Sequence, residues 1–308
     1  MALTWPSGVA ERLRTGAFAG VPFMLAAMLI FAGNDALAKH LAGLFAVAQI
    51  LFIRSVAGFV MIGPRIHRNG WRRTFMVRRP WLHALRLLLI VTEVALFYAA
   101  VRNMGLAQCL TIYQAMPVFA TALAVLLLGE RVRWRRWTAI AAGFAGVVLV
   151  LDPSADGVGW PAAMALIGTV LYAGVNVLTR MLRDSGPETL IGWHSLGMLV
   201  VTGAVAPFVW VPVGFWYFAL MVFLGLSATI GHLLLNRALM LSPTSAVMPF
   251  HYTLIVWGVI LGWIFWQEIP TAQTLVGAAI IVASGVYILY REQAVRAGAG
   301  ARTSTSAP

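Results

Sequence analysis

The sequence predicts an all-α polytopic membrane protein with ten transmembrane helices, arranged as two inverted five-helix repeats. Three observations support this fold class. First, 61% of the 308 residues are hydrophobic and only 10% are charged, whereas about a quarter of the residues in a soluble domain are charged. Second, the apolar residues fall in runs long enough to cross a bilayer. Third, the second half of the chain repeats features of the first half.

Each predicted helix is an apolar run of about 20 residues, the length that spans the hydrocarbon core. The runs are separated by gaps that contain charges, prolines or glycines. In the first half the gaps hold, in order, Lys39, the stretch from Arg65 to Pro80, Arg102, Glu130 and Asp152. The predicted spans are 17–38, 46–64, 81–101, 105–128, 136–151, 159–180, 189–210, 214–237, 243–267 and 271–290.

The placement of arginine predicts the orientation of the chain. Most of the 22 basic residues lie in the N-terminal segment, in the gap from Arg65 to Pro80, in the gap after Glu130, in the Arg180–Arg183 gap and in the C-terminal tail. Cytoplasmic loops carry the excess of Lys and Arg. We therefore expect both termini in the cytoplasm and the chain in a bacterial inner membrane. The tail, residues 294–308, is short and polar and is predicted to be disordered.

An internal repeat relates the two halves. "FAGNDALAKHL" from Phe31 resembles "YAGVNVLTRML" from Tyr172, and a shift of about 140 residues also brings Glu130 onto Glu268. The predicted repeats are residues 1–155 and 156–293. Because each contains five spans, the second copy must enter the membrane from the opposite side, as in many secondary transporters.

The same features resemble a known family. The chain is similar to the EamA-type branch of the drug/metabolite transporter superfamily through "FAGNDALAKHL", an arginine in the second span, and "AVRNMGLAQCLTIYQAMPVFATALAVLLLGE", followed by a Gly-rich fifth span. It is also similar to the YddG-type exporters of aromatic amino acids. The second copy departs from the pattern, since "WIFWQE" replaces "LLLGE" and no proline matches Pro117. The resemblance implies a ten-helix exporter of small metabolites.

Polar residues inside the spans predict where a substrate binds, because a charge at the bilayer centre costs roughly 3 kcal/mol. The predicted substrate-binding residues come from the third, fourth, sixth, eighth and ninth spans. They are Glu93, Phe97, Tyr98, Tyr113, Gln114, Tyr172, Asn176, His232, His251, Tyr252 and Trp257. Pro117 and Pro249 interrupt corresponding spans of the two halves, which is the usual position of a transporter's central site, and they are predicted hinges.

Several of these residues also have a structural interpretation. Glu93 can be a structural partner of Arg54 or Arg86, and Arg54 itself is interpreted first as a clamp between helices. His232 lies near the cytoplasmic end of its span and can be interfacial. Asp35 is predicted close to the outer membrane boundary, where its charge costs little.

The leading hypothesis is a monomeric secondary transporter that exports amphipathic metabolites, amino acids first, by alternating access. Proton coupling through Glu93 or the histidines is possible. The alternatives are a passive channel or facilitator and an intramembrane transferase. The sequence has no P-loop, no His-Glu-x-x-His and no Gly-x-Ser-x-Gly motif, which argues against an ATP-driven pump and against an enzyme. The expected partners are a small-molecule substrate and membrane lipid, with no nucleic acid, metal or cofactor.

Overall fold

The computed structural model describes residues 19–128, 134–151, 159–185, 187–242 and 247–304. These residues form helices that cross one bundle up and down, and no strand occurs among them. The elements are α2 (Val21–Leu44), α3 (Val47–Asn69), α4 (Trp71–Phe75), α5 (Pro80–Asn103), α6 (Leu106–Tyr113), α7 (Met116–Leu128), α8 (Trp134–Leu151), α9 (Trp160–Met181), η1 (Arg183–Ser185), α10 (Pro187–Val205), η2 (Ala206–Val209), α11 (Phe215–Leu241), η3 (Met248–Tyr252), α13 (Thr253–Trp266) and α14 (Ala272–Ser304).

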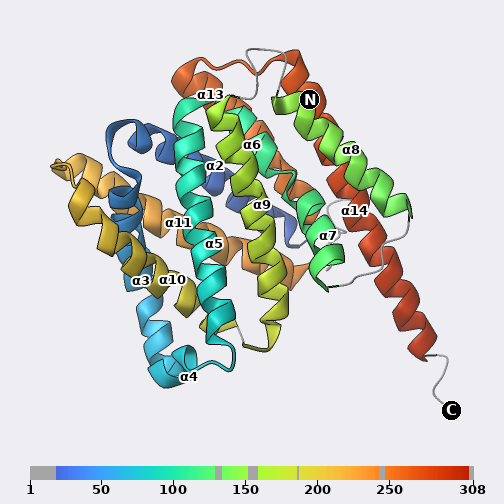
Figure 1. The fold of residues 1–308 in the computed structure, drawn as a ribbon, viewed down its shortest axis with the longest axis horizontal. Helices are drawn as coiled ribbons and strands as arrows, with labels where there is room; N and C mark the ends of the chain where they lie inside the picture. Colours follow the sequence, from blue (N-terminus) through green and yellow to red (C-terminus); the bar gives the residue numbers. More distant parts are fainter. Residues whose placement is uncertain (1–18, 129–133, 152–158, 186, 243–246, 305–308) are drawn as a thin grey trace, which may run out of the picture.

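The described part of each of the ten predicted spans is mainly helical. Within the described residues, 8 segments are long and apolar enough to cross a membrane, and α8 and α14 contribute the shorter apolar stretches Trp137–Leu151 and Ala272–Ile288. The upper end of the bundle in Figure 1 carries the α13–α14 connection, and the lower end carries α4. We use "upper end" and "lower end" in this sense throughout.

Two boundaries differ from the prediction. The first span runs from Val21 to Leu44 rather than over residues 17–38, so its polar residues lie deeper than the apolar run alone suggests. At the other end of the chain, α14 continues as helix to Ser304, through most of the segment predicted to be disordered. That segment contains several Ala and two Arg residues, which favour helix, so it can extend a helix that already exists.

The predicted interruptions occur where the prolines indicated them. The fourth span is divided into α6 and α7 after Tyr113. Pro117 is the second residue of α7, where its missing N–H costs little because the first helical N–H groups have no partner in the helix. In the ninth span, Pro249 lies in the 3₁₀ turn η3, which precedes α13.

The packing of the helices agrees with a two-fold relation between the halves. The long contact of α5 with α9 has its equivalent in the contact of α2 with α11. Three further contacts pair equivalent helices with each other, namely α3 with α10, α6 with α13, and α8 with α14. The α8–α14 pair forms one side of the bundle (Figure 1). Because consecutive spans alternate in direction, α2 runs upward and its equivalent α9 runs downward (Figure 1), as an inverted repeat requires.

Glycines allow the closest helix contacts, since lipid-embedded helices associate mainly through van der Waals packing and interhelical hydrogen bonds. At Gly225 of α11 a Cβ atom would overlap the backbone carbonyl oxygen of Arg54 in α3 and would lie 3.0 Å from the Cβ of Ala57. The backbones of α3 and α11 therefore touch at the level of Arg54. This contact sets the position of Arg54 relative to the second half.

Candidate functional site

Arg54 is the centre of a polar cluster inside the bundle. It projects from α3, and its Nη1 donates a hydrogen bond of 3.0 Å to the hydroxyl of Tyr98 on α5. Asp35 on α2 and Glu93 on α5 both lie within electrostatic range of this guanidinium. Neither carboxylate forms an ion pair with Arg54, since the ion pair seen among the described residues joins Lys39 and Glu268. Arg54 therefore keeps donors that no described side chain uses.

Two histidines extend this cluster into the second half. His194 on α10 and His232 on α11 both lie within electrostatic range of Arg54. His232 is exposed, and its ring lies 4.9 Å from that of Phe31 on α2. We call Asp35, Arg54, Glu93, His194 and His232 the Arg54 cluster. It draws side chains from α2, α3, α5, α10 and α11, so the two halves contribute to it jointly.

Aromatic side chains lie beside Glu93. The Tyr113 hydroxyl, at the end of α6, donates to the backbone carbonyl of Glu93 at 3.5 Å and also interacts with its carboxyl group. The ring of Phe97 meets that of Tyr113 edge-on at 5.1 Å. Tyr113 reaches this position because Gly168 of α9 has no side chain, and a Cβ there would overlap the tyrosine hydroxyl.

The predicted residues of α9 lie on the same side. Tyr172 is 37% exposed and lies within electrostatic range of Glu93. Asn176 donates a hydrogen bond of 2.8 Å to the carbonyl of Tyr172, one turn earlier in its own helix. Its amide oxygen stays available as an acceptor for other groups.

The structure brings together Glu93, Phe97, Tyr98, Tyr113, Tyr172, Asn176 and His232 from the predicted set. Tyr98 is only 1% exposed, because Arg54 and the surrounding core cover it. It can hold Arg54 in place but offers no open surface to a solute. Tyr98 therefore positions Arg54 and does not provide a stacking surface for a substrate.

Other predicted residues lie at the two helix interruptions. Gln114, which ends α6, is buried, and its amide donates a hydrogen bond of 2.9 Å to the backbone carbonyl of His251 in η3. The two interruptions therefore touch each other. Trp257 on α13 is half-buried and packs against the main core. Gln114 thus acts here as a bridge between the halves.

Tyr252 points elsewhere. It packs with Ile255 and Ala278, and a Cβ at Gly285 of α14 would overlap its hydroxyl. The physical reason is local: η3 is a 3₁₀ turn, with three residues per turn instead of 3.6, so an α-helical face does not predict the direction of its side chains. Tyr252 belongs to the contact between η3 and α14.

Sequence reasoning missed two residues of the cluster: His194, for which it predicted no role in the site, and Asp35, which it placed near a membrane boundary. α2 ends at Leu44, nine residues beyond Asp35, which is about 13 Å of helix at 1.5 Å per residue. The carboxylate therefore lies inside the bundle with Arg54. The signal that could have found it is its position four residues before Lys39, one turn deeper along the same face of the helix.

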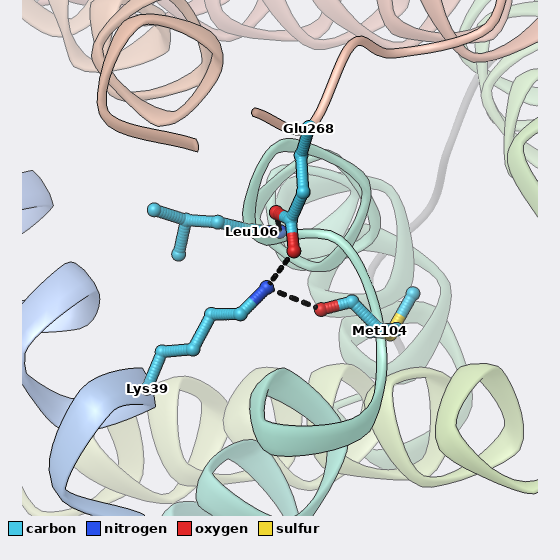
Figure 2. A network of polar contacts seen from close by, with 4 residues as sticks. All are labelled: Lys39, Met104, Leu106 and Glu268. Atoms are coloured by element: carbon cyan, nitrogen blue, oxygen red, sulfur yellow. Dashed lines mark hydrogen bonds and ion pairs between the residues drawn. The ribbon is translucent and has the colours of Figure 1, made fainter. Parts of the chain in front are cut away.

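A second polar site lies at the upper end and joins the two halves (Figure 2). Lys39, from α2, forms an ion pair with Glu268 of the α13–α14 connection, and its Nζ donates to the carbonyl of Met104 at 2.9 Å. The other oxygen of Glu268 accepts a hydrogen bond of 2.8 Å from the N–H of Leu106. The Lys39 ammonium also lies 4.9 Å from the centre of the Trp266 ring.

A cavity of about 610 Å³ opens beside this ion pair. Its lining includes Lys39, Glu268, His40, Arg102 and Asn103. We call it the upper vestibule. Most of its charged lining is basic, with Glu268 as the acidic member.

Comparison with known proteins identifies relatives over nearly the whole chain. The sequence model of the EamA-like transporter family matches twice, over residues 18–152 and 159–291. A riboflavin transporter of Rhizobium johnstonii is 30% identical over 216 residues, which are 69% of this chain and 71% of that protein.

Two further relatives align over longer stretches. An S-adenosylmethionine uptake transporter of Rickettsia bellii is 24% identical, covering 89% of this chain and 94% of the relative. A pseudopaline exporter of Pseudomonas aeruginosa is 27% identical, covering 85% and 93%. A solved crystal structure has the same fold, with a TM-score of 0.60 at 18% identity over 90% of this chain and 99% of the other.

Proposed function

Because the chain belongs to the EamA-like transporter family, we propose that it is a secondary transporter that exports small amphipathic metabolites, with neutral amino acids, aromatic ones included, as the leading substrate class. Transport occurs by alternating access around the Arg54 cluster. Relatives with names that indicate uptake and export both occur, so the direction is part of the proposal.

The observation that carries the substrate class is the arrangement of charges around Arg54. A guanidinium with unused donors suits a carboxylate, which it can bind with two parallel hydrogen bonds. Asp35 and Glu93, within electrostatic range of Arg54, suit an ammonium group. Tyr113 and Tyr172 offer aromatic surface on the same side. A solute with one carboxylate, one ammonium group and an apolar side chain matches all three features.

We also propose how the protein is oriented in the membrane and which parts of it move. The lower end, where α4 lies, faces the cytoplasm of a bacterial inner membrane, with both termini on that side, as the distribution of arginine predicts. The halves 1–155 and 156–293 move relative to each other. Pro117 and Pro249 serve as hinges because each lies at an interruption of a span.

Counterflow in proteoliposomes tests the substrate class. Vesicles loaded with an unlabelled amino acid should accumulate the labelled one in a saturable manner. N-acetylated and esterified analogues should not be exchanged, since the first lacks the ammonium charge and the second lacks the carboxylate charge. Riboflavin and S-adenosylmethionine are tested in the same assay, because relatives are named as transporters of these compounds. Exchange of either of these without exchange of any amino acid would contradict the substrate class, and flux that does not saturate would indicate a channel. The direction of transport is tested by loading the substrate into vesicles in which the orientation of the protein is known.

We expect Glu93→Gln to flatten the pH dependence of counterflow. A carboxylate inside the bundle can bind and release a proton during transport, whereas glutamine of the same size cannot. The measurement is the counterflow rate over about pH 5 to 8, with Glu93→Asp as the control that keeps the titratable group. A pH profile for Glu93→Gln that matches the wild type would remove Glu93 from proton coupling.

A further inference from the structure

We propose that the Lys39–Glu268 ion pair is the gate that closes the upper end of the transporter, and that it must break each time the upper vestibule gains access to the Arg54 cluster. The inference rests on the proposed alternating access and assigns its upper gate. Lys39 belongs to the first half of the chain and Glu268 to the second half. A relative movement of the halves at this end therefore separates the two charges.

The pair is well placed to hold the upper end closed. The side chain of Lys39 is 6% exposed and that of Glu268 is 29% exposed, so the interaction is only partly screened by water. The carbonyl of Met104 and the Trp266 ring provide further favourable contacts for the ammonium. A buried lysine that lost all of these partners would be strongly destabilised.

Glu268 also holds α6 in place. Gly105, which precedes α6, provides no side-chain cap, and the Glu268 carboxylate accepts the N–H of Leu106 instead. A carboxylate at a helix N-terminus also interacts favourably with the helix dipole. α6 ends at the interruption beside Gln114, so release of Glu268 frees the helix that connects the gate to the hinge region.

The backbone at the end of α13 directs Glu268 inward. Gln267 adopts a left-handed conformation, with φ of 57°, and the N–H of Glu268 bonds back to the carbonyl of Gly262 at 3.1 Å. A Cβ at Gly262 would lie 3.4 Å from the Glu268 carboxylate. This turn points the carboxylate toward α6 and Lys39, as Figure 2 shows.

The packing beneath the pair is tight. Ala36 and Ala38 on α2 are buried, as are Ala100 and Val101 on α5. The upper vestibule lies beside the pair, so a solute that enters from the upper end meets the ion pair before the buried residues of the main core. In the proposed gate, breaking the pair frees α2 to move relative to the α5–α6 turn.

Cys109 provides a reporter for opening. It is the single cysteine of the chain, it is fully buried in α6, and it follows Leu106 by one helical turn. It lies within electrostatic range of Lys39 as well as of Asp35 and Glu93. The thiol therefore lies near both the gate and the Arg54 cluster. In the proposed mechanism, a reagent from the upper end reaches it only when the gate opens.

The test measures the labelling rate of Cys109 by a membrane-impermeant maleimide added from either side. Lys39→Met and Glu268→Gln should each speed labelling from the upper side by about tenfold or more, because loss of one partner leaves the other without its counter-charge. Arg102→Met is the matched control: this arginine lines the same vestibule but is exposed, and its removal should leave the rate within about twofold of the wild type, the change expected for a screened surface charge.

Unchanged labelling in both gate variants would overturn the proposal. Glu268→Gln is the safer variant for folding, because its amide oxygen can still accept the Leu106 N–H. Size-exclusion profiles and full labelling in detergent with denaturant show that each variant is folded and that its thiol is intact. The readout requires no substrate. If no amino acid is exchanged but Cys109 is labelled faster in the gate variants, the substrate class is refuted and the gate is supported. If amino acids are exchanged but labelling is unchanged in both variants, the gate is refuted and the substrate class is supported.

Discussion

Replacing Arg54 with methionine is expected to abolish amino-acid counterflow while leaving a folded protein. Methionine has a similar length but offers no donor to a substrate carboxylate. Truncating one partner of a desolvated charge pair costs about 2–5 kcal/mol, and a factor of ten in affinity corresponds to about 1.4 kcal/mol. Counterflow of the best amino acid should therefore fall by about a hundredfold or more, as measured from its concentration dependence in proteoliposomes.

Three further variants separate binding from structure. Arg54→Lys keeps the charge but lacks the planar pair of donors, so it should recover only part of the activity. Tyr98→Phe removes the hydrogen bond that holds Arg54 and should have a smaller effect, of about tenfold. Arg86→Met is the matched control, because the Arg86 guanidinium already bonds to Thr179 at 2.8 Å and to the carbonyl of Leu190. Equal losses for Arg54→Met and Arg86→Met would show that Arg54 is merely a clamp between helices.

Replacing Gly225 with leucine is expected to destabilise the fold more than any surface change. The new side chain would meet the backbone carbonyl of Arg54 rather than a flexible side chain, so α3 and α11 must separate. Overpacking of a core costs about 1–3 kcal/mol, occasionally more, and a rigid backbone neighbour predicts the upper part of that range. Thermal unfolding in detergent, followed by fluorescence-detected size exclusion, measures the effect.

Gly33→Leu is the control for this substitution. It also places leucine at a helical glycine, in α2, but a Cβ at Gly33 has no neighbour within 4 Å. Leucine favours helix over glycine by somewhat less than about 1 kcal/mol, so this variant should be as stable as the wild type or slightly more stable. Equal unfolding temperatures for the two variants would mean that the α3–α11 contact does not limit stability.

Much of the fold could be predicted because lipid forces backbone groups to bond within their own helix, which gives each span a fixed length and a continuous apolar run. Proline marks interruptions for the same reason, and Pro117 and Pro249 are both found at them. The depth of Asp35 was predicted wrongly, because the apolar run that suggested residues 17–38 does not show that the helix continues to Leu44. The one available signal was the position of Asp35 one turn before Lys39.

The site could be predicted only in part. Glu93 and its aromatic neighbours follow from helical spacing, because they share one face or one helix end. The Lys39–Glu268 pair joins residues far apart in the sequence, and the sequence places each of them only in a gap between predicted spans. Their partnership depends on how the α13–α14 connection packs over α6. The direction of Tyr252 depends on a 3₁₀ turn that its residues do not specify.

The hydrogen bond from Gln114 to the His251 carbonyl has a consequence for leakage. It fastens the interrupted helix of one half to that of the other at the point where both are weakest. Bending of either joint would strain this bond. If the halves alternate as we propose, the shared bond favours joints that move together, and a state in which water runs continuously from one compartment to the other would require them to move separately.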